Sequence, residues 1–336
     1  MKRRNFVSRV GAATAAMPLA GCSALFGKKD YTNYKPKGDI PRRVLGKTGI
    51  EVSMLGFGSH LKKELIADPV LRDRMIKMGF EGGINTFDVY DHGGYKQFEP
   101  MGKSVRDIGR KNAVVSLCIV KDIKEMNAEI EEALRYFYTD YIDLYRLYSV
   151  DDDRVNAMEK AKQAGKIRAI GVVSHDEPTM NKYIDRYGDR LDYVMIVYNF
   201  HHNKGNPKVK HYPYNDYSAL IPRCERMNLG ILGIKPMGSD AMIELARKER
   251  FFKDREANVA QAMLRHIYDS PEVHCTMPAM NDMSEVVKNL ESAYNPSMSP
   301  HERELLNRLS GVAAQLKEAY LPDHYKWLER WSTRVV

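Results

Sequence analysis

Cysteine is scarce in this sequence, and no two of its four cysteines form a Cys-x-x-Cys pair. The sequence therefore predicts neither a disulfide framework nor a clustered cysteine site for zinc or iron–sulfur. A run of about 20 apolar residues is also lacking, so no segment is expected to cross a membrane as a stable helix. Long basic runs are absent as well, and the net charge of +8 includes four cations within the first nine residues. This charge pattern does not favour a nucleic-acid-binding protein.

The first 22 residues have the character of an export signal. The run Lys2-Arg3-Arg4-Asn5-Phe6-Val7 resembles a twin-arginine signal, and a short Ala- and Gly-rich stretch follows it. Leu19-Ala20-Gly21-Cys22 resembles a lipobox, in which the cysteine becomes the lipidated first residue. Two signals in the right order favour export over the alternative, a chance basic and Ala-rich N-terminus. We therefore predict export to the periplasmic side of the cell envelope, a membrane anchor through a lipid on Cys22, and a flexible tether over residues 23–41.

Residues 42–336 alternate short β-rich runs with amphipathic helical stretches, which indicates parallel strands joined by crossover helices. Arg43–Val52 is predicted to form a hairpin with a Gly-bearing turn. Eight strand candidates follow, and eight such strands close naturally into a (β/α)8 barrel of the α/β class. They are Ser53–Gly56, Ile84–Asp88, Ala113–Cys118, Ile142–Leu147, Ala169–Val173, Tyr193–Val197, Gly230–Ile234 and His274–Met277.

The alternative to a barrel is an open doubly wound sheet, but no Gly-x-Gly-x-x-Gly follows the first strand. A C-terminal helix is predicted over residues 300–320. The Trp327–Trp331 tail is expected to pack on the outside of the barrel.

Several stretches of this barrel resemble the aldo-keto reductase family, in the right order and with sensible spacing. They are the opening segment Arg43–Gly58, the strands Gly83–Asp88, Asp140–Tyr145 and Ala164–Val172, and Pro278 followed eleven residues later by Asn289. Any one of these matches is weak, but together they are specific. The resemblance implies a TIM barrel that acts as an oxidoreductase, with a nicotinamide cofactor that exchanges hydride with a carbonyl or alcohol.

The resemblance also implies a catalytic tetrad at the C-terminal ends of the strands, where barrel enzymes place their sites. In the family a Tyr donates a proton, an Asp and a Lys lower the pKa of that Tyr, and a His orients the substrate oxygen. Asp88 matches the Asp, whereas Cys118 falls on the Lys position and Tyr148 on the His position. Because a neutral thiol replaces the lysine, we expect Asp88 to have no adjacent cation and simple aldehydes to be reduced poorly.

The proton donor is therefore expected to be atypical. The family's Tyr position falls on His92 when a one-residue gap is placed, with Tyr90 and Tyr95 as neighbours. Tyr148 could donate the proton instead, since a phenol with a pKa of about 10 can act near neutral pH when a cation lies close. His92 or Lys121 would supply that charge. The alternative is that Tyr148 only fills the barrel mouth.

The predicted cofactor contacts are also altered. Ile234 replaces a Tyr that often stacks on the nicotinamide in the family. Glu285 lies where an Arg usually meets the 2′-phosphate of NADP, and a carboxylate there would repel that phosphate. NAD is therefore favoured at least as much as NADP. The residues expected to contact the cofactor are Ser174, His175, Lys235, Pro236, Asn281, Glu285 and Asn289.

Two features leave other functions open. The loop over residues 198–217 is rich in Tyr, Asn and His, which suits a polar, ring-shaped ligand such as a sugar. Histidines near strand ends could bind a divalent metal, although we predict no metal site. These histidines are His60, His92, His175, His201, His202 and His211. An oxidoreductase is the favoured function. The alternatives are a non-catalytic envelope binding protein and a metal-dependent lyase or hydrolase.

The export signal leads to a first prediction. Cys22→Ala should leave an unlipidated precursor, because the lipidated side chain is gone. Arg3→Lys combined with Arg4→Lys should block export through loss of the arginine pair. Membrane fractionation and mass spectrometry of the mature N-terminus measure both effects, and normal fractionation of the two variants would contradict the prediction.

Overall fold

The computed structural model describes residues 31, 33–58, 68–90, 97–119, 121–201, 217–238, 243, 246 and 258–315. Residues from Lys35 onward form one compact unit, separate from Met1–Tyr34. No helix within the described ranges is long and apolar enough to cross a membrane. The predicted export signal, Cys22 and the first part of the tether lie outside the described residues.

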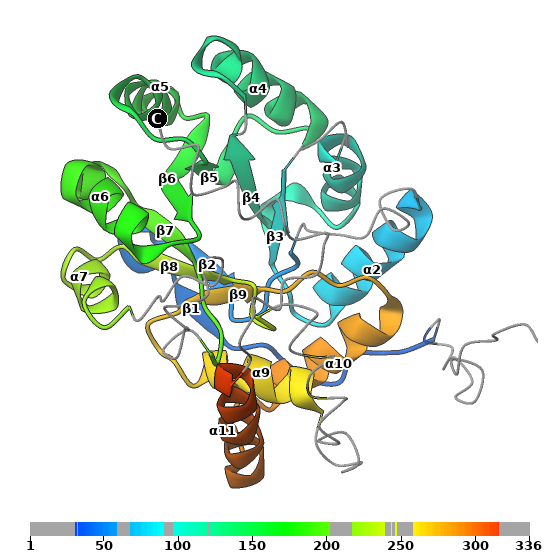
Figure 1. The fold of residues 1–336 in the computed structure, drawn as a ribbon. Coiled ribbons are helices and arrows are strands. Elements are labelled where there is room, and N and C mark those ends of the chain that lie inside the picture. The colour runs from blue at the N-terminus through cyan, green and yellow to red at the C-terminus, as the bar shows by residue number, and fades with distance from the viewer. Residues whose placement is uncertain are drawn as a thin grey trace, which may run out of the picture. The chain divides into compact units, whose positions relative to one another are not determined.

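Seven parallel strands form the wall of a barrel, and helices lie around its outside (Figure 1). Residues 55–58 take the eighth position, because Leu55 bridges to Thr276 of the last strand and Phe57 bridges to Phe87 of the first. The predicted (β/α)8 barrel is therefore confirmed. In order around the wall, the seven strands are β3 Thr86–Val89, β4 Val114–Ile119, β5 Ile142–Leu147, β6 Ile167–Ser174, β7 Tyr193–Val197, β8 Gly230–Ile234 and β9 Cys275–Met277.

The predicted strand bounds agree with the observed ones to within two residues, but the first strand begins later than expected. Ser53 belongs to the preceding hairpin and donates its backbone N–H to Asn85 Oδ1 at 2.7 Å. Barrel pairing starts only at Leu55. The apolar run continues from the hairpin into the barrel, so no local feature of the sequence marks the change of partner.

The predicted hairpin is confirmed and closes the N-terminal end of the barrel. β1 Arg42–Val44 pairs antiparallel with β2 Glu51–Ser53, and the 3-10 turn η2 Gly46–Thr48 joins them. Gly46 has a φ of 49°, and a Cβ there would lie 2.3 Å from the backbone N of Gly230. Three apolar side chains pack into the barrel interior, namely Leu45, Ile50 and Val52. The functional site is therefore expected at the opposite end of the barrel, where the strands have their C-terminal ends.

Nine described α-helices follow the chain between and after the strands. Their N-termini are often capped by a side-chain oxygen, as at Asp68, Asp151, Asp176, Asn258 and Asp282. They are α2 Pro69–Glu81, α3 Phe98–Asp107, α4 Ile123–Tyr136, α5 Asp152–Gln163, α6 Glu177–Tyr187, α7 Leu220–Arg226, α9 Val259–Tyr268, α10 Met283–Tyr294 and α11 Pro300–Gln315. Short 3-10 turns are η3 Arg110–Asn112 and η4 Gly188–Arg190. α11 confirms the predicted C-terminal helix as far as Gln315, and Trp327–Trp331 lies outside the described residues.

The barrel interior leaves no space beside Gly171 on β6. Gly171 lies in register between Arg146 of β5 and Tyr193 of β7. A Cβ built on Gly171 would lie 2.2 Å from the ring of Tyr193, which is fully buried. The missing side chain therefore lets the tyrosine ring cover this position of the wall.

Gly171→Ala should destabilise the fold by about 1–3 kcal/mol, because a buried ring has to move out of its packed position. Gly311→Ala is the matched control, since Gly311 lies in α11 with nothing within 4 Å of its added Cβ. That change should be neutral or stabilise by about 0.5–1 kcal/mol. Thermal unfolding measures both, and equal melting temperatures would contradict the packing argument.

Candidate active site

A buried ion pair lies in the barrel interior near the C-terminal ends of β3 and β5. Asp88 and Arg146 are 3% and 4% exposed. Arg146 Nη1 donates to Asp88 Oδ1 at 2.5 Å, and Nη2 donates to Oδ2 at 3.1 Å. Ser116 on β4 donates its hydroxyl to Asp88 at 2.7 Å and accepts from Arg146 at 3.1 Å. Arg146 also donates to the carbonyl of Leu117 at 3.2 Å. Three adjacent strands thus hold one pair of charges.

Arg146 shows that the expectation of no cation beside Asp88 is wrong. Burial is the largest influence and lowers the pKa of Arg146, but the Asp88 carboxylate, its hydrogen bond and the neighbouring Cys118 and Tyr193 together raise this pKa above its ordinary value. Cys118, at the position expected for a lysine, pairs with Arg146 in the strand register. Burial raises the pKa of the Cys118 thiol to about 12, so this side chain is neutral. The cation is therefore supplied by the neighbouring strand.

Lys121, considered from the sequence as a source of charge, has different partners. Its Nζ donates to Glu132 on α4 at 3.2 Å, and this hydrogen bond raises the pKa of Lys121. Its backbone N–H donates to Glu129 at 3.0 Å. These contacts belong to the start of α4 rather than to the ion pair.

Two tyrosines, Tyr90 and Tyr148, lie one step beyond the ion pair toward the barrel mouth. Each comes two residues after a member of the pair, and side chains two residues apart in a strand point to the same side. Both pack against the interior cluster that contains Cys118. Burial, followed by the Asp88 carboxylate, raises the pKa of Tyr90, so this phenol is not ionised at neutral pH. The structure thus brings together four of the predicted catalytic residues.

Tyr95 lies outside the described residues. So do four of the histidines expected at strand ends, namely His60, His92, His202 and His211. His201 is 5% exposed, and its Nδ1 lies 3.0 Å from the Ser310 hydroxyl on α11. His175 is half-buried after β6. In the part of the chain that the structure describes, no three His, Cys, Asp or Glu side chains form a group that could hold a metal. These residues add no support for the metal-dependent alternative.

Lys235 follows β8 at the same end of the barrel and directly precedes Pro236. Its φ of 55° is left-handed, which costs a non-glycine residue about 1–2 kcal/mol. Asn199, which is 1% exposed, donates to the Lys235 carbonyl at 3.4 Å. Burial lowers the pKa of the Lys235 amine to about 8. A bound anion would therefore favour the charged form of this lysine.

Negative charge gathers at the N-terminus of α10. Asp282 caps the helix by accepting from the backbone N–H of Glu285 at 2.9 Å. The Glu285 carboxylate in turn accepts from the backbone N–H of Asn281 at 2.6 Å. Asn289, one turn further along, is 5% exposed. These contacts hold the Glu285 carboxylate at the helix end where it was expected to repel a phosphate.

Ser174 uses its hydroxyl within its own turn. The hydroxyl donates to the carbonyl of Asp176 at 2.9 Å and accepts from the Asp176 backbone N–H at 3.2 Å. Asp176 caps α6 by accepting from the Thr179 backbone N–H at 2.9 Å. Ser174 therefore shapes the connection from β6 to α6, and its contact with a nicotinamide stays a prediction.

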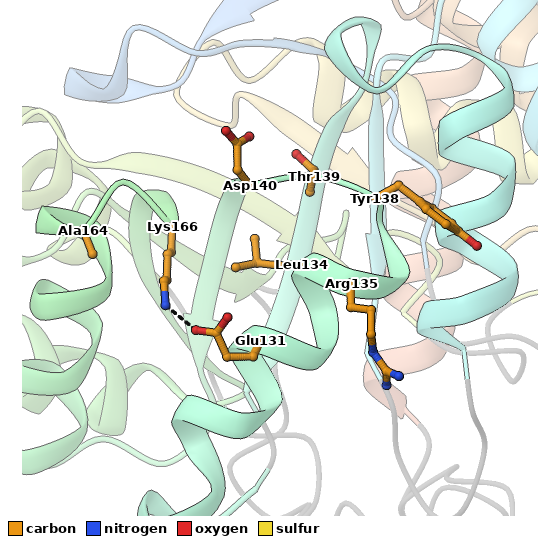
Figure 2. Close-up of a pocket in the computed structure, with 8 residues that line it drawn as sticks. All are labelled: Glu131, Leu134, Arg135, Tyr138, Thr139, Asp140, Ala164 and Lys166. Carbon is orange, nitrogen blue, oxygen red and sulfur yellow. Dashed lines mark hydrogen bonds and ion pairs between the residues drawn. The ribbon is translucent and has the colours of Figure 1, made fainter.

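An open hollow on the opposite end of the barrel is separate from this site (Figure 2). It is lined by the end of α4 and by the loops that precede β5 and β6. Glu131 and Lys166 form an ion pair across it. Because barrel enzymes place chemistry at the C-terminal ends of strands, this hollow is not the candidate active site.

Arg146 is the functional residue that sequence reasoning missed. The signal was present, because an arginine interrupts the otherwise apolar end of the predicted strand Ile142–Leu147. Arginine is almost never fully buried unless it is paired. An inward-facing arginine in a buried strand therefore predicts a buried acidic partner, although it does not identify Asp88.

Comparisons with known proteins agree with this geometry. A model of the aldo/keto reductase family matches residues 67–310. L-galactose dehydrogenase of Arabidopsis thaliana is 21% identical over 323 residues, which cover 84% of this chain and 98% of that protein. The holo form of aldo-keto reductase AKR11C1 from Bacillus halodurans has a TM-score of 0.64 at 18% identity, covering 80% of this chain and 96% of that one. An aldo-keto reductase from Klebsiella pneumoniae in complex with NADPH has a TM-score of 0.61 at 21% identity, covering 81% and 95%. These structural likenesses show the fold.

The lowered pKa of Lys235 predicts unusual reactivity of its amine. With an acylating reagent, labelling of Lys235 should reach half its maximum near pH 8, because the neutral amine is the reactive form. Lys121 is the comparison within the same sample, since a hydrogen bond raises the pKa of that lysine. Peptide mass spectrometry across a pH series measures both, and Lys235→Arg should remove the label. Labelling of Lys235 only at higher pH than Lys121 would contradict the effect of burial.

Proposed function

The chain belongs to the aldo/keto reductase family, a family of oxidoreductases, and from this premise we propose that it is a nicotinamide-dependent enzyme acting on a sugar-like carbonyl or alcohol. The observation that carries the proposal is the Asp88–Arg146 ion pair, with two phenols beyond it toward the barrel mouth. Burying two charges costs free energy of desolvation. This pair lies at the end of the barrel where barrel enzymes place their active sites.

The side chains at this end suit proton transfer to a carbonyl oxygen. When bound, a reduced nicotinamide supplies hydride to the carbonyl carbon. The hydroxyl of Tyr148 or Tyr90 donates the proton to the carbonyl oxygen, and water returns a proton to the phenolate. Arg146 supplies positive charge and Asp88 orients it. We propose that this acid is atypical, because the positions predicted for the family's tyrosine, lysine and histidine carry other residue types.

The residues at the neighbouring strand ends fit a dinucleotide. Burial lowers the pKa of Lys235, and a phosphate beside it would restore its charge and gain a desolvated ion pair. Pro236, His175 and Asn289 would complete the cofactor contacts. The carboxylates of Asp282 and Glu285 suit ribose hydroxyls better than a 2′-phosphate. We therefore propose NAD at least as strongly as NADP.

The substrate proposal draws on one relative and one loop. The similar protein from Arabidopsis thaliana is an L-galactose dehydrogenase, which is a sugar oxidoreductase by its name. The loop over residues 198–217 carries aromatic and amide side chains of the kind that contact sugar rings. We also propose that the protein works on the periplasmic side of the envelope, anchored through Cys22, on the strength of its N-terminal signals.

The function is tested with the mature, natively exported protein. It should bind NADH or NADPH in a fluorescence titration, and reduced nicotinamide should accumulate when NAD(P)+ and an aldose such as L-galactose are added. Mass spectrometry of heat-released ligands and elemental analysis accompany the assay. If neither dinucleotide binds, the oxidoreductase proposal fails. A released non-nucleotide ligand or a stoichiometric metal would then support one of the two alternatives.

Glu285 should determine the preference between the two cofactors. NADH should bind at least as tightly as NADPH, and Glu285→Arg should shift the ratio of dissociation constants toward NADPH by about tenfold, which corresponds to 1.4 kcal/mol. Glu291→Arg is the matched control, because it makes the same charge change at an exposed position of α10. A clear NADPH preference in the unchanged protein would contradict the charge argument.

A further inference from the structure

The two phenols follow different members of the Asp88–Arg146 pair along the chain, and both pack against the same interior cluster. Asp88 and Tyr90 belong to β3 and the residue after it, whereas Arg146 and Tyr148 belong to β5 and the residue after it. β4 lies between these strands. Since neighbouring strands are about 4.8 Å apart, the backbones of β3 and β5 are separated by about 10 Å, and the long Arg146 side chain reaches across β4 to Asp88. Tyr90 therefore follows the carboxylate, and Tyr148 follows the guanidinium.

The hydrogen bonds fix the orientation of this ion pair. Both terminal nitrogens of Arg146 donate to Asp88, one to each carboxylate oxygen. Ser116 and the Leu117 carbonyl on β4 accept further hydrogen bonds from the guanidinium. A guanidinium held by four bonds at 4% exposure has no room to change its orientation. The direction of the charge pair is thus a constant feature of the site.

Asp88 and Arg146 also shift the pKa values of neighbouring groups in opposite directions. Burial is the largest influence on the pKa of Tyr90, and the Asp88 carboxylate then raises this pKa by more than Arg146 lowers it. Burial also dominates at Cys118 and Tyr193, but there Arg146 is the stronger of the two charges and lowers the pKa. The pair therefore opposes ionisation on the β3 side and favours it on the side of β4 to β7.

We propose that Arg146 is a positioning residue that takes the place of the missing lysine and selects Tyr148, rather than Tyr90, as the proton donor. This inference rests on the proposed function. When hydride reaches the carbonyl carbon, the carbonyl oxygen takes the proton of the donor, which becomes a phenolate until water returns a proton. A cation beside that phenolate stabilises it, and a carboxylate destabilises it. Arginine serves here because it stays charged at every working pH.

Further titratable groups at this end, among the described residues, are on β4, β7 and α4 and directly after β8. Burial keeps the Cys118 thiol and the Tyr193 phenol neutral. Lys235, charged below about pH 8, follows β8, which lies three wall positions from both β3 and β5, so its charge does not distinguish the two phenols. Among the described residues, the buried Glu129 on α4 acts on Cys118, and its carboxylate accepts from the Lys121 backbone N–H.

The order of ionisation of the two phenols tests the proposal without any substrate. The protein is labelled with tyrosine carrying ¹³C at Cζ, and Tyr148→Phe and Tyr90→Phe identify the two signals. Tyr148 should ionise at lower pH than Tyr90. Arg146→Gln should raise the pKa of Tyr148 by about 1–3, the effect of losing an adjacent opposite charge, and Arg146→Lys should restore most of it. A Tyr90 that ionises first, or a Tyr148 that does not respond to Arg146→Gln, overturns the proposal.

Turnover supplies the second arm. With an active substrate, Tyr148→Phe should lower kcat at least 100-fold while leaving the dissociation constant for NADH within twofold, and Tyr90→Phe should cost less than tenfold. The reverse result overturns the choice of Tyr148. If Arg146→Gln does not fold, the comparison of Tyr148 with Tyr90 in the unchanged protein and in Arg146→Lys still decides. Failure of dinucleotide binding would instead defeat the proposed function, which the titration does not depend on.

Discussion

The buried pair of Asp88 and Arg146 is the constraint on which the rest of this site depends. Two ions at 3% and 4% exposure have left water, at a cost on the order of several kcal/mol each, and each is the other's main charged partner. Removing one partner from such a pair typically costs about 3–5 kcal/mol. The register of β3, β4 and β5 must therefore stay as it is, since each of the three strands contributes a hydrogen-bonding group to the pair.

The remainder of the barrel is arranged around that paired charge. Gly171 has no side chain where Tyr193 covers the wall, and this keeps the layer containing Arg146 compact. The N-terminal hairpin fills the opposite end with Leu45, Ile50 and Val52, and the charged pair lies toward the C-terminal ends of the strands. The same end holds the phenols and Lys235. The position of the ion pair, the packing around it and the location of the site therefore all depend on the barrel fold.

Three further charged groups, one positive and two negative, bear on the proposed binding of a dinucleotide. Lys235 is a desolvated amine whose charged form an anion would favour. The carboxylates of Asp282 and Glu285, both tied into the first turn of α10, oppose an additional phosphate there. Lys235 would favour the phosphates that all nicotinamide dinucleotides share. The two carboxylates would disfavour the 2′-phosphate that distinguishes NADP. The preference for NAD that we propose follows from this combination.

The sequence by itself determined the elements whose signals are local. Alternating apolar runs predicted seven barrel strands to within two residues, the Gly-bearing turn predicted the hairpin, and the motif ending in Asp88 placed a carboxylate at a strand end. It also predicted Cys118 at the position of the family's lysine. Only the tertiary structure decided that a cation lies beside Asp88, because Arg146 and Asp88 are 58 residues apart in the chain and meet through the pairing of β3, β4 and β5. The sequence also did not predict where the first strand starts or that the pKa of Lys235 is lowered. The start of a strand depends on its pairing partner, and the pKa of a lysine depends on its burial, and both are decided by which parts of the chain pack together.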